Sequence, residues 1–217
     1  MAKSPLDFLK LLTKKEEHPV AKRIIGGKEE EGELGNITNP YNNQVYTYYV
    51  KCNPEDARRG LKAAAEGFQK IRRTPLSQRI AWLNDVADRL EKERERFAKL
   101  ITQEVGKPIK ESKLEVQRCI ENLRICAGEG YNILGETIPT DATLSGIRTH
   151  SFYKRVPAGV VVAITPFNFP LNLVAHKVGP ALIAGNSVVL KPTPEAPFTA
   201  YSFMKLFLES KYAIPEA

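Results

Sequence analysis

The sequence has few cysteines and no long apolar run, and each absence excludes a class of protein. Its three cysteines, Cys52, Cys119 and Cys126, do not build a disulfide framework and lack the C-x-x-C spacing of a zinc site. No apolar run reaches the roughly 18 residues of a membrane-spanning helix, and the N-terminus mixes acids with lysines instead of forming a secretory signal. We therefore expect a cytoplasmic protein without a membrane partner.

Metal, phosphate-loop and nucleic-acid motifs are also lacking. His18, His150 and His176 lie in separate segments without ligand spacing, so no metal is predicted. No G-x-G-x-x-G follows a predicted strand, and no G-x-x-x-x-G-K-[ST] occurs. The net charge of +7 is spread along the chain, with +3 in residues 151–217 (six basic minus three acidic) and the other +4 in residues 1–150. We therefore predict no nucleic-acid partner.

The 217 residues are 42% hydrophobic, enough for a sizeable core in one or two domains. Residues 1–20 are expected to be an extension with a helical stripe of Phe8, Leu11 and Leu12. Residues 24–27 and 44–51 are predicted to be strands that pair as a hairpin, with a turn at residues 39–43 before the second.

Three helices are predicted next. Asn53 and Pro54 form a helix start, and this helix should run to about Arg72. A second helix should run from Thr74 to Gly106, and a third over about residues 109–131. The apolar face of the third helix carries Leu114, Cys119, Ile120, Leu123 and Cys126, so both cysteines are expected in the core, whereas Cys52 is the one plausible exposed thiol.

The C-terminal part predicts an α/β fold with an incomplete doubly wound parallel sheet. Residues 136–144 and 148–156 form a polar hairpin that needs another domain or subunit to pack on. The apolar runs 159–164 and 187–190 predict strands covered on both faces, with helices at 171–184 and 197–210. A sheet that stops there should leave an unpaired edge, and the last helix, with Phe203, Leu206 and Phe207, should lose part of its cover.

Ligands of open α/β sheets bind at the carboxyl ends of the strands, where residues 165–170 and 191–194 lie. Asn168 could stabilise an oxyanion or simply cap the helix that follows. Lys191 could bind a ligand or be a solvated lysine. Both pairs of alternatives stay open on local sequence alone.

Four segments of this region resemble the central signature of the aldehyde dehydrogenase superfamily. They are residues 157–170, 176–182, 185–192 and 197–200, and Arg79 and residues 104–108 resemble the N-terminal half of that family. The resemblance covers about residues 22–217. It implies a Rossmann-like NAD(P)-binding domain over residues 21–135 and 157–217, and an oligomerisation hairpin over residues 136–156.

The resemblance also implies roles for single residues. Asn168 matches the oxyanion-hole asparagine of the family, and Lys191 matches the lysine that hydrogen-bonds the adenine ribose. The loop along the nicotinamide side of the cofactor is matched by Ile164, Thr165, Pro166 and Phe167. Pro194 stands where NAD-preferring members often have a glutamate, and Glu195 follows one place later, so the cofactor is expected to be NAD or NADP.

The catalytic cysteine, the general-base glutamate and the catalytic domain of the family are not found in the sequence up to Ala217. We therefore expect the N-terminal, cofactor-binding part of an NAD(P)-dependent aldehyde dehydrogenase, which oxidises an aldehyde to a carboxylic acid and assembles as a homo-oligomer. Two alternatives are half of a split enzyme, completed by a second chain with the catalytic half, and a non-catalytic nucleotide-binding or interaction module.

Overall fold

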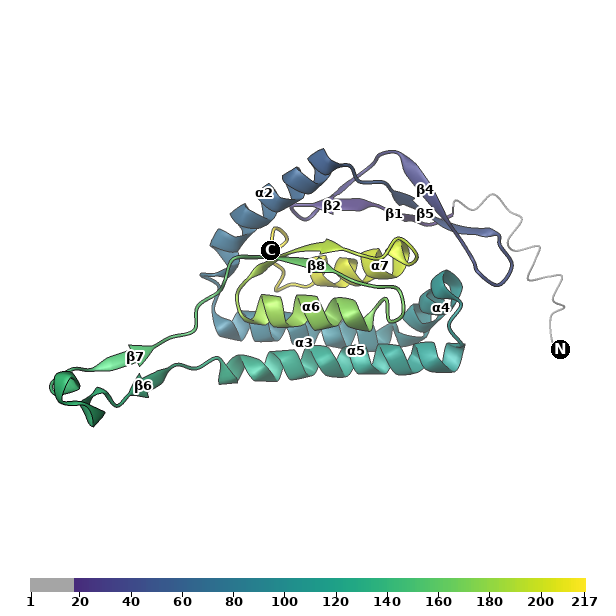
Figure 1. The fold of residues 1–217 in the computed structure, drawn as a ribbon. Coiled ribbons are helices and arrows are strands. Elements are labelled where there is room, and N and C mark those ends of the chain that lie inside the picture. The colour runs from purple at the N-terminus through teal and green to yellow at the C-terminus, as the bar shows by residue number, and fades with distance from the viewer. Residues whose placement is uncertain (1–17) are drawn as a thin grey trace.

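The computed structural model describes residues 18–217, which form a layered α/β body with a long arm (Figure 1). The helix expected around Phe8, Leu11 and Leu12 lies outside the described residues. Val20, at the end of the expected extension, is part of strand β1 (Val20–Ala21) and pairs with Tyr48. The next strands are β2 (Arg23–Ile25), β3 (Lys28–Glu30), β4 (Leu34–Thr38) and β5 (Val45–Val50). After them come α2 (Pro54–Ile71), α3 (Leu76–Lys92), α4 (Arg94–Val105), α5 (Ile109–Glu129), β6 (Glu136–Ile138), β7 (Ser151–Tyr153), β8 (Val160–Ile164), α6 (Asn172–Ile183), β9 (Ser187–Lys191) and α7 (Pro197–Leu208).

The N-terminal strands do not pair as predicted. β2 pairs with β3 in antiparallel fashion, and β5 lies between β1 and β4. Gly26 and Gly27 have φ angles of 56° and 75°, the left-handed conformation that a two-residue type I′ turn requires at both positions. The chain therefore reverses directly after Ile25, and the prediction of a hairpin between residues 24–27 and 44–51 is wrong. The turn predicted at residues 39–43 does connect β4 to β5.

The helix predicted from Pro54 is confirmed as α2. The Asn53 side chain accepts a hydrogen bond from the Asp56 amide at 3.0 Å, and the Asp56 carboxylate accepts one from the Asn53 amide at 3.0 Å. This reciprocal capping box satisfies two backbone donors that the first turn of a helix leaves free.

The single helix expected from Thr74 to Gly106 is wrong, because Glu93 leaves the helical conformation (φ −101°, ψ 12°) between α3 and α4. Leu90 and Phe97 on either side of the break are both fully buried. They lie seven residues apart, close to two helical turns, so the apolar period continues through the break and does not reveal it.

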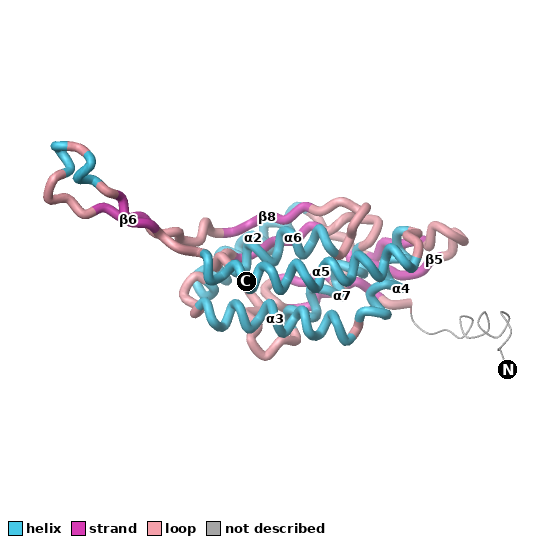
Figure 2. Tube along the Cα trace, turned by 90° about the horizontal axis from the view of Figure 1, so that it is seen from below, coloured by secondary structure: helices cyan, strands magenta, loops and turns pink. Residues whose placement is uncertain are grey.

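The main core lies among α3, α4, α5, α6 and α7, and Figure 2 shows these helices packed beside one another. Cys119 and Cys126 belong to this core, as predicted, whereas Leu114 on the same helix is exposed. The largest fully buried side chains here are Phe97, Phe203, Leu83, Leu90, Ile101, Ile120, Leu123 and Leu171. None of the helices formed by residues 18–217 combines the length and apolar character needed to cross a membrane.

Helix α7 keeps its cover, contrary to expectation. Phe203, Leu206 and Phe207 are buried, and the indole N–H of Trp82 in α3 donates to the carbonyl oxygen of Phe207 at 3.0 Å. One backbone donor on the free edge of β9 also has a partner in this chain, because the Val188 amide donates to the carbonyl oxygen of Ala217 at 3.1 Å.

The predicted hairpin forms an arm (residues 136–156) that projects from the body in both views (Figures 1 and 2). The pairing is shorter than the predicted segments 136–144 and 148–156, because only residues 136–138 (β6) and 151–153 (β7) pair. The tip folds instead into two short 3₁₀ turns, Thr140–Ala142 and Leu144–Gly146.

The predicted β-α-β-α unit is confirmed as β8, α6, β9 and α7, with β8 and β9 parallel. Figure 1 shows β8 between α2 on one side and α6 on the other. The expectation that both faces are covered is wrong for β8 in the described chain, where Val162 is 54% and Ile164 61% exposed. A hydrogen bond from Ser187 Oγ to the Ala64 carbonyl (2.7 Å) joins α2 to the amino end of β9, away from these exposed side chains.

Candidate functional site

Two loops meet where β8 and β9 end. Ile164 and Lys191 are register partners in the parallel pair, and the Thr165 amide donates to the carbonyl oxygen of Lys191 at 3.3 Å. Parallel strands end at the same edge of a sheet, so the pairing of the strands alone brings these residues together. The structure thus places Ile164, Thr165 and Lys191 side by side, as the sequence predicted.

The side chains at this edge differ in exposure. Lys191, Pro166 and Phe167 are exposed, as is Ile164, so both a cation and apolar surface are accessible. Thr165 is buried, and its hydroxyl oxygen has no hydrogen-bond partner among the described residues. A buried hydroxyl without a partner is uncommon, because leaving it unpaired costs about 1–3 kcal/mol.

Asn168 lies farther along the same loop and is exposed. It does not cap α6, because the N-cap residue is Leu171, whose side chain makes no capping hydrogen bond. The interpretation of Asn168 as a simple helix cap is therefore wrong. Its backbone carbonyl oxygen accepts a hydrogen bond from Lys107 Nζ at 2.7 Å.

The start of α6 is capped by Glu115, which comes from the middle of α5. One oxygen of its fully buried carboxylate accepts hydrogen bonds from the amides of Leu171 (2.9 Å) and Asn172 (3.2 Å). The other oxygen is paired with Lys107, whose ammonium also lies 4.0 Å from the centre of the Phe169 ring. Lys107 lies in a segment that resembles the family, but nothing in the sequence indicated a function for it or for Glu115.

The start of α7 is capped in the same way by Glu104, at the end of α4. Its two carboxylate oxygens accept hydrogen bonds from the amides of Phe198 (2.8 Å) and Thr199 (2.7 Å). Burial raises the pKa of Glu104 to about 7, although the hydrogen bonds from Thr199 and Phe198 act to lower it. Carboxylates from one helical corner, residues 104–115, thus hold the first turns of both helices that follow the site loops.

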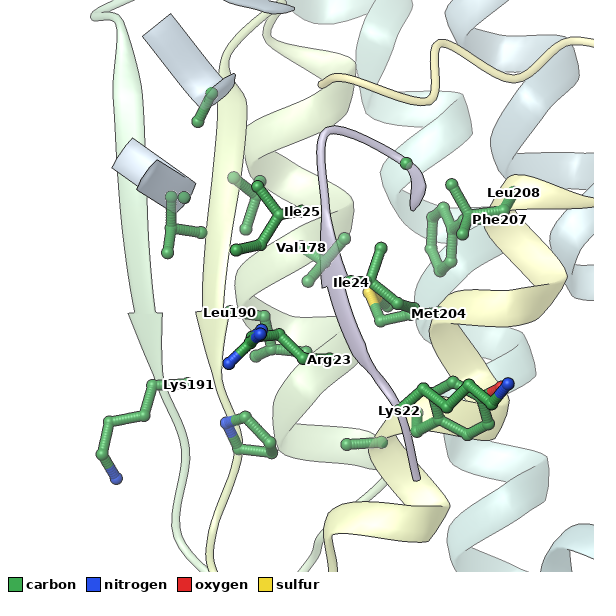
Figure 3. A pocket seen from close by; sticks show the side chains of 18 of the residues that line it. Lys22, Arg23, Ile24, Ile25, Val178, Leu190, Lys191, Met204, Phe207 and Leu208 are labelled. Atoms are coloured by element: carbon green, nitrogen blue, oxygen red, sulfur yellow. The ribbon is translucent and has the colours of Figure 1, made fainter. Parts of the chain in front are cut away.

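A cleft of about 500 Å³ lies between the β2–β3 hairpin, β9 and α7 (Figure 3). Ile24, Leu190, Met204 and Phe207 give it an apolar lining. Residues 191–194 contribute to its wall, whereas the loop of residues 164–168 does not. The cleft therefore adjoins only one of the two predicted loops.

None of the three cysteines has the low pKa of a nucleophile. Burial raises the pKa of the Cys52 thiol, and also those of Cys119 and Cys126, which lie in the core. The thiolate is the reactive form, so these cysteines are poor candidates for covalent catalysis.

Comparison with known sequences identifies the family. The sequence profile of the aldehyde dehydrogenase family matches residues 28–216. The lactaldehyde dehydrogenase of Methanococcus vannielii is 38% identical over 183 residues, which are 84% of this chain and 38% of that protein. The 3-sulfolactaldehyde dehydrogenase of Priestia megaterium is 38% identical over 187 residues, or 86% of this chain and 39% of that protein.

Solved structures agree with this match and confirm the predicted α/β fold. Aldehyde dehydrogenase 21 from Physcomitrella patens, in complex with succinate, superposes with a TM-score of 0.86 at 30% identity and covers 89% of this chain and 41% of its own. The NADP-dependent glyceraldehyde-3-phosphate dehydrogenase from Bacillus halodurans, complexed with NADP, gives a TM-score of 0.81 at 29% identity, over 87% of this chain and 41% of its own. The chain therefore spans about 40% of the length of these relatives. The profile match over residues 28–216 and the similarity to these relatives show that the chain belongs to the aldehyde dehydrogenase family.

Proposed function

We propose that this chain supplies the oxyanion donor and part of the dinucleotide cleft of an NAD(P)-dependent aldehyde dehydrogenase, which oxidises an aldehyde to a carboxylic acid. One observation carries the proposal. The hydrogen bond from the Thr165 amide to the Lys191 carbonyl joins the loop of Asn168 to the strand end of Lys191. A donor for the reacting carbonyl and a cation for the cofactor thereby belong to one sheet edge.

The residues at this edge fit a dinucleotide. The exposed ammonium of Lys191 can donate to ribose hydroxyls, and the Thr165 hydroxyl, which has no partner within residues 18–217, is a further polar group. Ile164 and Phe167 expose apolar surface on which a planar ring can pack. A bound nicotinamide would accept the hydride of the aldehyde. Pro194 occupies the position where NAD-preferring members of the family often have a glutamate. The carboxylate of the next residue, Glu195, accepts a hydrogen bond from Thr193. The preference between NAD and NADP is therefore open, and both are tested.

Asn168 has the chemistry of an oxyanion donor. Its carboxamide N–H₂ would donate to the aldehyde oxygen as negative charge develops there during attack by a thiolate. The raised pKa values of Cys52, Cys119 and Cys126 argue that this thiolate comes from outside the chain. In this proposal the chain orients the aldehyde oxygen and the cofactor, and a catalytic domain performs the covalent step.

Titration calorimetry with NAD and with NADP tests the assignment of the two loops. Lys191 is the one charged residue among residues 164–168 and 191–194, so we expect affinity in the millimolar range, a binding free energy of about 4 kcal/mol. Lys191→Ala should remove most of this binding, whereas Asn168→Ala should leave it nearly unchanged, because an oxyanion donor contacts the reacting carbonyl. Lys110→Ala, at an exposed lysine of α5, is the matched control. Equal losses for Lys191→Ala and Asn168→Ala, or a larger loss for Asn168→Ala, would mean that the two loops are wrongly assigned.

We also propose that the arm joins this chain to a second copy of itself. Leu144 at its tip is 90% exposed and Phe152 in β7 is 78% exposed. Apolar side chains gathered on a projecting hairpin mark an association surface, because water solvates them poorly. Sedimentation of the full chain should show concentration-dependent association that Phe152→Ser weakens at least about tenfold, while the control Tyr41→Ser, at an aromatic residue 93% exposed outside the arm, should not. A chain that stays monomeric at all concentrations would contradict this proposal.

A further inference from the structure

The loop that carries Asn168 has few backbone hydrogen bonds of its own, and one of them runs from the Leu173 amide of α6 to the Phe169 carbonyl oxygen at 3.0 Å. Pro166 and Pro170 lack an amide N–H, so two of its residues have no backbone hydrogen to donate. Between Thr165 and Leu171, the hydrogen bond from Lys107 Nζ to the Asn168 carbonyl is the one that joins this loop to a distant element in the described chain. Lys107 is therefore the outside support of the residue that carries the candidate donor.

Lys107 contacts the loop at two successive residues. Its ammonium donates to Asn168 and lies over the ring of Phe169, where the negative face of the aromatic ring attracts a cation. Glu115, the ion-pair partner of Lys107, holds the amides of Leu171 and Asn172 just beyond the loop. The pair thus contacts both ends of the segment from Asn168 to Asn172.

The local backbone explains why Lys107 lies at this place. Gly106 ends α4 in the left-handed conformation (φ 68°), and Pro108 is the N-cap residue of α5. An added Cβ on Gly106 would lie 3.0 Å from a ring carbon of Pro40, so the turn is closely packed. The Lys107 side chain is mostly buried and that of Glu115 fully buried, so neither charge is screened by water as a surface ion pair would be.

We propose that the Lys107–Glu115 ion pair is the positioning element of the Asn168 carboxamide. This inference rests on the proposed function of Asn168 as the oxyanion donor. An oxyanion donor must lie about 3 Å from the developing charge, and a displacement of about 1 Å in a catalytic group can cost on the order of a hundredfold in rate. In this assignment Lys107 touches no substrate and acts only through the loop.

NMR of the full chain with isotope-labelled asparagine reports on both ends of the pair. Asn168 and Asn172 report on the loop, and Asn186, whose side chain bonds Gly159 and Ala181, reports on the rest of the fold. The variants are Lys107→Met, the conservative Lys107→Arg, and the neutral double variant Lys107→Met with Glu115→Gln, which leaves no buried unpaired charge. Lys110→Met, an exposed lysine three residues away, is the control.

We expect the Asn168 signals, side chain included, to shift and broaden in Lys107→Met and in the double variant, with amide exchange of Asn172 at least about tenfold faster. The Asn186 signals should stay unchanged, Lys107→Arg should restore those of Asn168, and Lys110→Met should match the wild type. Asn168 signals at their wild-type position in folded Lys107→Met or in the folded double variant would overturn the proposal.

Nucleotide titration of the same samples separates this inference from the proposed function. Unaltered Asn168 signals together with intact Lys191-dependent binding would refute the positioning role alone. Altered Asn168 signals in a chain that binds neither NAD nor NADP would refute the proposed function and leave the contact between Lys107 and the loop established.

Discussion

Replacing Glu104 with glutamine should change how the stability of the protein depends on pH. Glu104 belongs to α4, and its side chain is buried against the first turn of α7. Burial raises its pKa from the ordinary 4.5 to about 7. Two backbone N–H groups favour the charged carboxylate, but removing it from water costs more, so the folded protein holds its proton more tightly than the unfolded chain.

The direction and size of the effect follow from these two pKa values. Between pH 4.5 and pH 7 the native state binds more protons than the unfolded state, so the free energy of unfolding falls as pH rises and levels off above pH 7. The two pKa values differ by 2.5 (7 minus 4.5), and about 1.4 kcal/mol per pH unit gives a total loss of about 3 kcal/mol. Most of that loss should occur between about pH 4.5 and pH 7, the two pKa values.

Urea denaturation across this pH range measures the effect. Glu104→Gln should remove the slope due to this group, because a carboxamide does not titrate. Its nitrogen cannot accept from the Phe198 or Thr199 amide, so the variant should be less stable than the wild type at about pH 5 by roughly 1–3 kcal/mol, the cost of an unpaired buried N–H. Glu66→Gln, the same change at an exposed carboxylate of α2, should keep the wild-type slope. A wild-type slope in Glu104→Gln would refute the reasoning.

The glycines of α2 and the cysteines give two more predictions. Gly60→Ala should stabilise the protein by about 0.5–1 kcal/mol, because alanine favours a helix and nothing lies within 4 Å of the added carbon. Gly67→Ala should destabilise it, because the added carbon would overlap the backbone carbonyl oxygen of Glu216. Thermal denaturation measures both, and equal effects would show that the Glu216 segment does not pack against α2. The purified chain should also produce no NADH or NADPH from aldehydes, since none of its cysteines is activated. Aldehyde-dependent reduction that survives replacement of all three cysteines would contradict both this expectation and the mechanism.

Local sequence signals were sufficient for the elements that local interactions control. Asn53 and Pro54 predicted the start of α2, because a capping box needs only residues three positions apart. The apolar runs and the helix between them predicted the β8-α6-β9-α7 unit, and with it that Ile164 and Lys191 lie side by side. Once the strands are known, their parallel pairing brings the two strand ends to the same edge of the sheet.

The tertiary structure alone decided the rest. The break at Glu93 has no local signal, because the apolar period continues from Leu90 to Phe97 and no glycine or proline interrupts it. The pairing of β2 depends on whether Gly26 and Gly27 end a strand or form a turn, which composition does not distinguish.

The supports of the site depend even more on the tertiary structure. Glu115 reaches backbone amides 56 and 57 residues away, and Glu104 reaches amides 94 and 95 residues away. In the sequence each is one acid among 25, and nothing nearby marks it as buried. A buried carboxylate is tolerated only where backbone donors or a cation compensate for lost hydration, and those partners come together only when α4 and α5 pack against α6 and α7.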